Sequence, residues 1–438
     1  MSESTAENIL FYGYYDDFAG FFAKISKELS LIADCNVHFL SGFPSGVLAW
    51  RRLRQRNAKW LAPRVIVRDV QLRLRWGRRI PHSAYGRYSP KWVLDYEMQT
   101  TGRLKGGAGF VARAATVDKL VKKIKPKVAV ISGDSRPTAK LFALAAQRHG
   151  AKVFYFEQGP FGTTFLDASG VNANLDTSLD RGLATELGPG IPPSNRIPQE
   201  PRGRFFRALD YAMSVVPAIP AEYTSRLSEL RKQTGSSPHS GKMFTDAHLL
   251  VLQVPDDANF RIHSAFSDFK TILRLTCAAL PAGHRIAVRE HPKFIGQYGK
   301  EFYQMIEKDE RLCLQKHTSV DQALKEARTV VTINSMMGFE ALMVGKKVFC
   351  LGNSYYAQLA ATAQAPHTLV ADLSSFFQTY ESKQAAEDNS RQVYIQNFFT
   401  KLAIPGHFRD QGTEAAQNCA KVIAQDLQSF NIKKKVLA

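Results

Sequence analysis

Three stretches decide the fold: LLVLQVPDDANFRIHS from Leu249, IAVREHPK from Ile286 and VVTINSMMGFEALMVG from Val330. Each is an apolar run of strand length that passes at once into a polar cluster. A buried strand needs no such cluster, whereas ligands of open α/β sheets collect at the carboxyl ends of the strands. The pattern therefore predicts a parallel sheet that presents a site at its carboxyl edge.

The sequence around these stretches alternates between strand and helix patterns. Strands are expected at residues 248–254, 285–290, 312–315, 329–333 and 347–351, and helices at residues 265–280, 295–308, 319–327 and 336–344. This alternation is typical of a doubly wound α/β domain. We expect a C-terminal Rossmann-like domain over residues 241–390, followed by a helical tail over residues 391–438.

The N-terminal half shows the same rhythm and predicts a second Rossmann-like domain over residues 1–240. Strands are expected at residues 9–14, 37–40, 127–131 and 152–156, with helices near residues 17–31, 107–125 and 138–149. The last two strands end in SGDSRP and EQGPFG, which place Arg136 and Glu157 on a second polar rim. The Ser- and Gly-rich segment QTGSSPHSGK, residues 233–242, is read as the linker between the domains.

A basic segment interrupts the N-terminal domain. The chain has a formal net charge of +19, and residues 51–91 hold 13 Lys or Arg and one acidic residue, Asp69. AWRRLRQRNAKWL is expected as an amphipathic basic helix and VIVRDVQLRLRW as an exposed strand. The positive field of such a segment attracts nucleic acid, an anionic leaflet or an anionic substrate. The same charges are equally compatible with a solvated basic surface that binds no partner.

Composition and motifs exclude several classes of protein. The five cysteines have no CxxC spacing, which favours free thiols in a reducing cytoplasm over disulfides or a zinc site. The polar start MSESTAEN does not resemble a secretory signal, and no apolar run approaches the roughly 20 residues that span a bilayer. GxGxxG, Walker A, HExxH and GxSxG motifs are absent from the sequence.

The strand TVVTI passes into the helix SMMGFEAL through Asn334 and Ser335. Ser335 is a natural N-cap, and the exposed N–H groups of such a helix start bind a phosphate without a metal. Gly338 would allow close approach to another group, and Glu340, one turn in, could meet ribose hydroxyls. The alternative is that Ser335 is a cap and no more.

Titratable residues gather at the other two strand ends. Arg289, Glu290, His291 and Lys293 lie within five positions and together suit an anion, although a lone strand-end histidine is more often structural. Asp256 and Asp257 follow Gln253, with Arg261 close behind. Adjacent carboxylates point in different directions, so one could act as nucleophile or base while the other caps the next helix.

Taken together, these clusters resemble the capsule polysaccharide biosynthesis proteins of Gram-negative bacteria, in particular the retaining β-Kdo glycosyltransferases of KpsS/LipB type. The resemblance covers about residues 127–172 and 249–356, and includes GDSRP, FEQG and GVN in the N-terminal half. It implies a GT-B architecture, with two Rossmann-like domains facing each other across a cleft. It also implies CMP-Kdo as donor, a covalent aspartyl adduct and no metal or other cofactor.

Residue roles follow from the resemblance position by position. Asp257 would be the nucleophile of the QxxxD pattern that begins at Gln253, and Glu157 the acidic residue across the cleft. His291 of the HP motif and Ser335 of the NS motif would contact CMP, and Gln253 and Asn334 are also expected to bind substrate. The candidates for binding the Kdo carboxylate are Arg136, Arg261 and Arg289.

The acceptor is left open between a lysophospholipid, a lipid-linked Kdo chain and a glycan end, and a capsule lipid acceptor of phosphatidylglycerol type would lie at an anionic leaflet. The resemblance implies work in the cytoplasm, peripherally on the inner face of the cytoplasmic membrane, alongside other capsule biosynthesis and export proteins. We expect the basic segment to dock on an anionic leaflet. The alternatives are a GT-B enzyme using CMP-sialic acid or a UDP-sugar, and a basic nucleic-acid-binding protein. The last is disfavoured because no nucleic-acid-binding module is recognisable.

Overall fold

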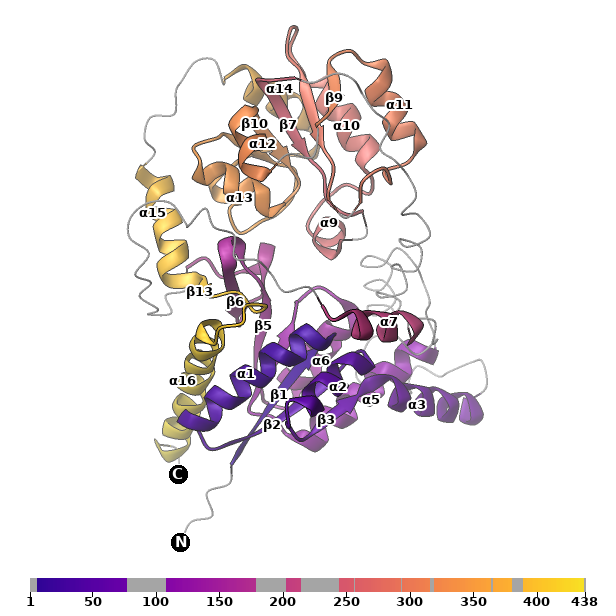
Figure 1. Cartoon of the computed structure of the whole chain (residues 1–438), viewed down its shortest axis with the longest axis vertical. Coiled ribbons are helices and arrows are strands. Elements are labelled where there is room, and N and C mark those ends of the chain that lie inside the picture. The colour runs from indigo at the N-terminus through magenta and orange to yellow at the C-terminus, as the bar shows by residue number, and fades with distance from the viewer. Residues whose placement is uncertain are drawn as a thin grey trace. The chain divides into compact units, whose positions relative to one another are not determined.

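The computed structural model describes residues 6–76, 108–178, 202–213, 244–255, 257–292, 294–315, 319–363, 365–379 and 389–436 (Figure 1). The chain divides into two compact units. Unit 1 comprises Met1–Val171, Leu175–Leu227 and Asn397–Ala438, and unit 2 comprises Asn172–Asn174 and Ser228–Gln396. The predicted linker at residues 233–242 lies outside the described residues.

Unit 1 is built on a seven-stranded sheet of order β13-β6-β5-β4-β1-β2-β3. Five neighbouring strands run parallel, and β6 pairs antiparallel with both β5 and β13 at one edge. Because the strand order reverses direction between β1 and β4, the carboxyl ends of these two strands form a topological switch point. The strands are β1 (Glu7–Gly13), β2 (Cys35–Ser41), β3 (Ala58–Trp60), β4 (Val128–Ser132), β5 (Lys152–Gln158), β6 (Thr163–Asp167) and β13 (Ile404–Pro405).

The helices of unit 1 pack their apolar faces on this sheet. Helix α1 buries Phe21, Phe22, Ile25 and Leu29 in the same apolar core as β1 and the C-terminal helix α16. The last helix of the predicted tail therefore completes the core of the N-terminal unit. The helices are α1 (Asp16–Ile32), α2 (Pro44–Arg52), α3 (Leu61–Trp76), α5 (Ala108–Ile124), α6 (Pro137–Arg148), α7 (Arg204–Met213) and α16 (Glu414–Val436).

Both secondary-structure predictions for the basic segment are wrong. The expected helix over AWRRLRQRNAKWL is replaced by the end of α2 at Arg52, a turn, and β3 (Ala58–Trp60). The expected strand over VIVRDVQLRLRW is the helix α3, because Leu61, Ala62, Val65 and Leu72 lie on one helical face that packs against α5. Residues 77–91 of this segment lie outside the described residues.

Unit 2 has a six-stranded, fully parallel sheet of order β12-β11-β10-β7-β8-β9, with its switch point between β7 and β10. The predicted fold class, α/β with two Rossmann-like doubly wound domains, is confirmed; the predicted facing of the two across a cleft stays a prediction. The strands are β7 (Ala247–Val251), β8 (Ile286–Arg289), β9 (Leu312–Leu314), β10 (Ala327–Thr332), β11 (Val348–Cys350) and β12 (Ala361–Thr362).

Two helices of unit 2 begin later than the sequence indicates. The helix expected from residue 265 begins at Phe269, because the Asp268 carboxylate accepts from Thr271 N at 2.8 Å and caps it. The helix expected from residue 295 begins after Gly299, whose φ is +98°. The helices are α9 (Ala258–Ile262), α10 (Phe269–Ala278), α11 (Lys300–Lys308), α12 (Val320–Glu326), α13 (Met336–Met343), α14 (Leu369–Gln378) and α15 (Asn389–Asn397), which a π-helical turn, Phe398–Leu402, follows.

Among the described residues, no helix combines the length and the hydropathy needed to cross a bilayer.

Candidate functional site

The strand register of unit 2 brings three predicted site residues to the same level. Thr332 of β10 and Arg289 of β8 both pair with Val251 of β7. Asn334, His291 and Gln253 each stand two residues beyond these partners. The three strand ends therefore deliver their polar residues side by side at the switch point, as the sequence pattern predicts.

An amide pair joins the two strand ends at this switch point. Gln253 Nε2 donates to Asn334 Oδ1 at 2.9 Å, and Asn334 N donates to Gln253 Oε1 at 3.2 Å. Asn334 Nδ2 also donates to the carbonyl oxygens of Asn259, at 3.1 Å, and Asn353, at 3.2 Å. These bonds fasten together the loops that carry the other predicted rim residues.

Asp257 is the N-cap of the short helix α9. Its Oδ1 accepts from Asn259 N at 2.9 Å, and its own N–H donates to Val254 O at 2.9 Å. Of the two adjacent carboxylates, the residue in the nucleophile position thus also caps the helix. Asp256 lies outside the described residues. Arg261 is partly buried on α9, one turn after its cap.

Ser335 caps α13, as the sequence predicts. Its Oγ accepts from Met337 N at 3.3 Å, and the Tyr356 hydroxyl donates to its carbonyl oxygen. The close approach predicted at Gly338 is made by Tyr356: a Cβ there would overlap the Tyr356 hydroxyl and meet its Cζ at 2.9 Å. Glu340 lies in α13 with 8% of its surface exposed, and its predicted contact with ribose stays a prediction.

The end of β8 is held by two tyrosines. Tyr298 Oη accepts from His291 N at 3.0 Å and donates to Gln253 O at 3.2 Å, which joins the ends of β8 and β7. Tyr303 Oη donates to the buried Glu290 carboxylate at 2.6 Å, and burial followed by this bond raises the pKa of Tyr303. Sequence reasoning missed both tyrosines, because nothing in QYGKEFY marks a partner several residues away.

The remaining residues predicted near this strand end differ in how they are held. Arg289 is buried and its Nη1 donates to Gln315 Oε1 at 3.0 Å. Lys293 lies outside the described residues. Burial raises the pKa of Tyr298, so its hydroxyl stays neutral and acts as a bridge between strands.

Unit 1 has a rim of its own at the ends of β4 and β5. Glu157 is the penultimate residue of β5 and lies beside Gly133, and its Oε1 accepts from Gln158 N at 3.0 Å. Asp134 is buried and its Oδ2 accepts from Val171 N at 3.0 Å, which fastens the GVN segment to GDSRP. Arg136 precedes α6, and its guanidinium lies over the Tyr14 ring at 5.0 Å.

A charged cluster that sequence reasoning missed lies at the ends of β1 and β2. Arg202 Nε donates to Asp16 Oδ1 at 2.6 Å, and Arg202 also pairs with Asp210. Ser45 Oγ donates to Asp210 Oδ2 at 2.6 Å, and the guanidinium lies 4.0 Å over the Tyr15 ring. These bonds dock α7 onto α2. Asp16 and Ser45 stand more than 150 residues from their partners Arg202 and Asp210, so no local sequence signal marks these contacts.

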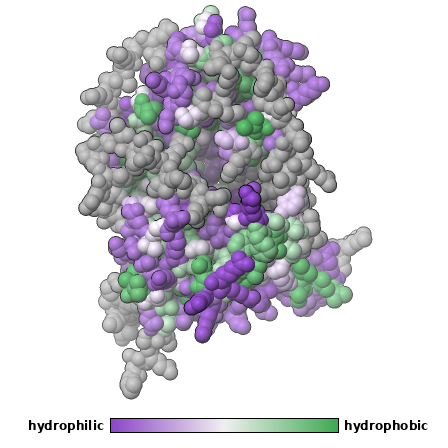
Figure 2. Space-filling model, in the orientation of Figure 1, coloured by the Kyte–Doolittle hydropathy of each residue, from purple (hydrophilic) through white to green (hydrophobic). Residues whose placement is uncertain are grey.

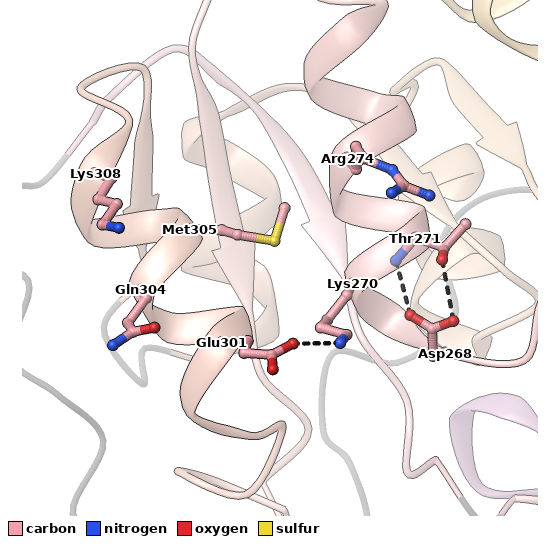
Figure 3. Close-up of a pocket in the computed structure, with 8 residues that line it drawn as sticks. All are labelled: Asp268, Lys270, Thr271, Arg274, Glu301, Gln304, Met305 and Lys308. Atoms are coloured by element: carbon pink, nitrogen blue, oxygen red, sulfur yellow. Dashed lines mark hydrogen bonds and ion pairs between the residues drawn. The ribbon is translucent and has the colours of Figure 1, made fainter.

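A hollow of about 500 Å³ lies between α10 and α11 of unit 2 (Figure 3). None of the predicted site residues lines it. Its Lys270–Glu301 pair, at 2.5 Å, is exposed and contributes little to stability. The lining residues are Asp268, Lys270, Thr271, Arg274, Glu301, Gln304, Met305 and Lys308.

The part of the chain that the structure describes holds no group of three or more His, Cys, Asp or Glu side chains arranged for a metal ion. The groups predicted to bind an anion are the N–H groups at the start of α13 and the side chains of the strand ends.

Two doubly wound units, with a polar rim and a capped helix start at the switch point of the second, define an α/β protein of the GT-B-like class. The family of capsule polysaccharide biosynthesis proteins matches residues 195–409. This match confirms the family resemblance predicted from the sequence.

Two curated relatives are similar to parts of the chain. Protein FixF of Sinorhizobium fredii (strain NBRC 101917 / NGR234) is 28% identical over 239 residues, which are 52% of this chain and 49% of FixF. Capsule polysaccharide export protein KpsS of Escherichia coli is 27% identical over 118 residues, which are 25% of this chain and 30% of KpsS. The chain thus spans about half the length of one relative and under a third of the other.

Solved structures are similar at low identity. KpsC beta Kdo 2,7 transferase of Thermosulfurimonas dismutans is 19% identical with a TM-score of 0.33, covering 64% of this chain and 85% of that one. UDP-GlcNAc 2-epimerase of Methanocaldococcus jannaschii is 12% identical with a TM-score of 0.37, covering 95% of this chain and 99% of that one.

Proposed function

We propose that the protein is a glycosyltransferase of capsular polysaccharide biosynthesis that transfers Kdo from CMP-Kdo, with retention, to a lipid or glycan acceptor. The observation that carries the proposal is the switch point of unit 2. There Gln253 and Asp257 of the QxxxD pattern lie beside Asn334 and Ser335 of the NS pattern, within the range that the capsule family matches.

The proposed donor site begins at the capped start of α13. The N–H groups there and the positive end of the helix dipole favour the phosphate of CMP. His291 is placed at the same level by the strand register and is the proposed second contact to CMP. Glu340 is the proposed partner of the ribose. Arg136, Arg261 and Arg289 are the proposed cations for the carboxylate of Kdo, and Lys293 is a proposed contact to an anionic group of the substrate.

The proposed reaction has two displacements. One Asp257 carboxylate oxygen bonds to the anomeric carbon of Kdo while the bond from that carbon to the phosphate oxygen breaks, and CMP leaves with the electron pair. The acceptor hydroxyl then bonds to the same carbon, the ester bond to Asp257 breaks, and the hydroxyl proton passes to a base, for which Glu157 is proposed. Two inversions give net retention.

The proposal places the reaction at the inner face of the cytoplasmic membrane, where a lipid or lipid-linked acceptor is found. Other capsule biosynthesis and export proteins are proposed as partners. The leaving phosphate needs positive charge, and the α13 helix start together with arginine or lysine supplies it, so the proposal needs no metal ion.

Asp257→Asn separates the two roles of this residue. Asparagine caps a helix about as well as aspartate, so the free energy of unfolding should change by less than about 1 kcal/mol. The nucleophilic carboxylate is lost, and transfer from CMP-Kdo should fall on the order of a thousandfold or more. Mass spectrometry of reactions with a panel of lipid and glycan acceptors would follow both the product and a Kdo adduct on the protein.

Asp268→Asn is the matched control, because Asp268 also caps a helix of unit 2 and has no proposed chemical role. It should retain transfer and the adduct. Full transfer by the Asp257→Asn protein would refute the nucleophile assignment. Turnover of CMP-sialic acid or a UDP-sugar in place of CMP-Kdo would refute the proposed donor.

A further inference from the structure

Helix α3 has two apolar faces. The first apolar face is buried on the side of the helix that packs against α5, and it consists of Leu61, Ala62, Val65 and Leu72. The second apolar face is exposed. It consists of Ile66, Val67, Val70 and Leu74, whose exposed fractions are 40%, 57%, 48% and 83%. Positions 66, 67, 70 and 74 follow the helical repeat, so these four side chains make one continuous stripe on the outside of unit 1.

The stripe is flanked by arginines. At 100° per residue, Arg64, Arg68 and Arg75 fall along one side of it and Arg73 on the other, and all four are exposed. Residues 51–76 contain nine Lys or Arg and a single acidic residue, Asp69, which pairs with Arg73 at 2.8 Å. Burial, then the charges of Arg64 and Lys123, lower the pKa of Lys59, in keeping with a strongly positive local field.

Helix α3 lies at the margin of unit 1, away from the sheet (Figure 1), and hydrophobic side chains reach the surface in this part of the molecule (Figure 2). An apolar stripe between rows of arginine is the pattern of helices that lie in the plane of a lipid headgroup layer. There the apolar side chains enter the acyl boundary, and the long arginine side chains keep their charges among the phosphates.

We propose that the outer face of α3 binds an anionic lipid surface, with Ile66, Val67, Val70 and Leu74 inserted and Arg64, Arg68 and Arg75 on the headgroups. The single acidic residue of the segment is already paired, so the charges complement an anionic leaflet. The proposal concerns membrane docking alone and does not depend on which sugar or acceptor the protein uses.

Sedimentation of the full chain with vesicles tests the proposal without donor or acceptor. Vesicles of phosphatidylcholine alone are compared with vesicles that also contain phosphatidylserine, which supplies charge without the glycerol headgroup of a phosphatidylglycerol acceptor. We expect binding to the anionic vesicles and at least tenfold weaker binding for Val67→Ser/Val70→Ser/Leu74→Ser. Arg64→Gln/Arg68→Gln/Arg75→Gln should weaken binding by about fivefold per residue at low salt and by less at high salt.

Leu31→Ser/Ile32→Ser is the matched control, since these residues of α1 are 73% and 47% exposed in the same unit and no arginine neighbours them in the sequence. It should bind like the unaltered chain. Leu74→Ser alone, at the most exposed position of the stripe, serves if the triple variant fails to fold. Unchanged vesicle binding by a folded stripe variant would overturn the proposal. So would a stripe variant that only dissociates a dimer of this chain and still sediments with lipid.

Discussion

At the scale of single residues, Gln253 and Asn334 show how two polar side chains fasten adjacent strand ends to each other. The sequence predicts both as substrate-binding, and the structure gives both amide groups protein partners. Gln253 is 7% exposed, so little of its surface is left for a ligand. Truncating either residue leaves buried polar groups of the other without their partner, which costs about 1–3 kcal/mol.

We therefore expect Gln253→Ala and Asn334→Ala each to lower the free energy of unfolding by about 1–3 kcal/mol. The double variant should lose less than the sum of the two, because each single variant already breaks the same pair. Urea unfolding of the four proteins measures this coupling. Additive losses, or no loss of stability with a selective loss of CMP binding, would instead favour direct contact with the substrate.

His248 lies in the core of unit 2 and sets an acid limit on its stability. Its ring nitrogens bond to Thr329 Oγ1 at 2.8 Å and His284 Nδ1 at 2.9 Å. Burial, then the charges of His284 and Arg328, lower the pKa of His248 to about 3. The unfolded chain, with a histidine pKa near 6.5, thus binds more protons than the folded chain between pH 6.5 and pH 3.

Stability should therefore fall as the pH drops below 6.5, by roughly 1.4 kcal/mol per pH unit from this one group. His248→Gln removes the titration and should make the pH dependence between pH 7 and pH 5 shallower by about 2 kcal/mol. Urea unfolding at both pH values measures the difference, with the exposed His367→Gln as control. Equal slopes for His248→Gln and the unaltered chain would contradict the role of His248.

At the scale of elements, continuous apolar runs predict strands more reliably than runs in which apolar and polar residues alternate. The apolar runs before Gln253 and Asn334 are apolar on both faces of a strand, which suits the interior of a sheet, and both form strands. In VIVRDVQLRLRW the apolar residues alternate with polar ones, which suits an exposed strand. They form a helix because the face of Val65 and Leu72 packs against α5, a contact the local pattern cannot contain.

Capping residues set the element boundaries that the periodicity leaves uncertain. Ser335 is predicted as an N-cap and is one. Asp268 caps α10, which begins four residues after the expected start, and several nearby polar residues could equally have been the cap. The candidate site is therefore predictable in its residue types and positions along the chain. Its hydrogen bonds are not, because Tyr298 and Tyr356 reach it from outside the motifs.

At the scale of the whole molecule, strand order is what the sequence leaves open. The alternation of strands and helices predicts two parallel sheets, and both are present. It does not indicate that β6 and β13 extend the first sheet as an antiparallel edge. Nor does it show that the chain returns from unit 2 to complete unit 1, since that contact joins residues almost 400 positions apart.

This return predicts that unit 1 cannot fold without the C-terminal helix. Lys24 Nζ donates to the carbonyl oxygen of Asp410 at 2.6 Å, and Arg409 Nη2 pairs with Asp17 Oδ2 at 2.8 Å. Helix α16 then buries a row of apolar side chains in the core shared with α1 and β1. The row consists of Ala415, Ala416, Cys419, Ala420, Ile423, Ala424 and Leu427.

Deletion of residues 414–438 should therefore cost unit 1 more than about 5 kcal/mol, which is comparable with the whole stability of a small domain. Deletion of residues 431–438 alone starts beyond the last buried side chain of that row and is the matched control. Thermal unfolding and limited proteolysis should show that the longer deletion leaves unit 1 open to cleavage while unit 2 keeps a cooperative transition. A longer deletion that melted like the full chain would mean that the parallel sheet and α1 close the core of unit 1 on their own.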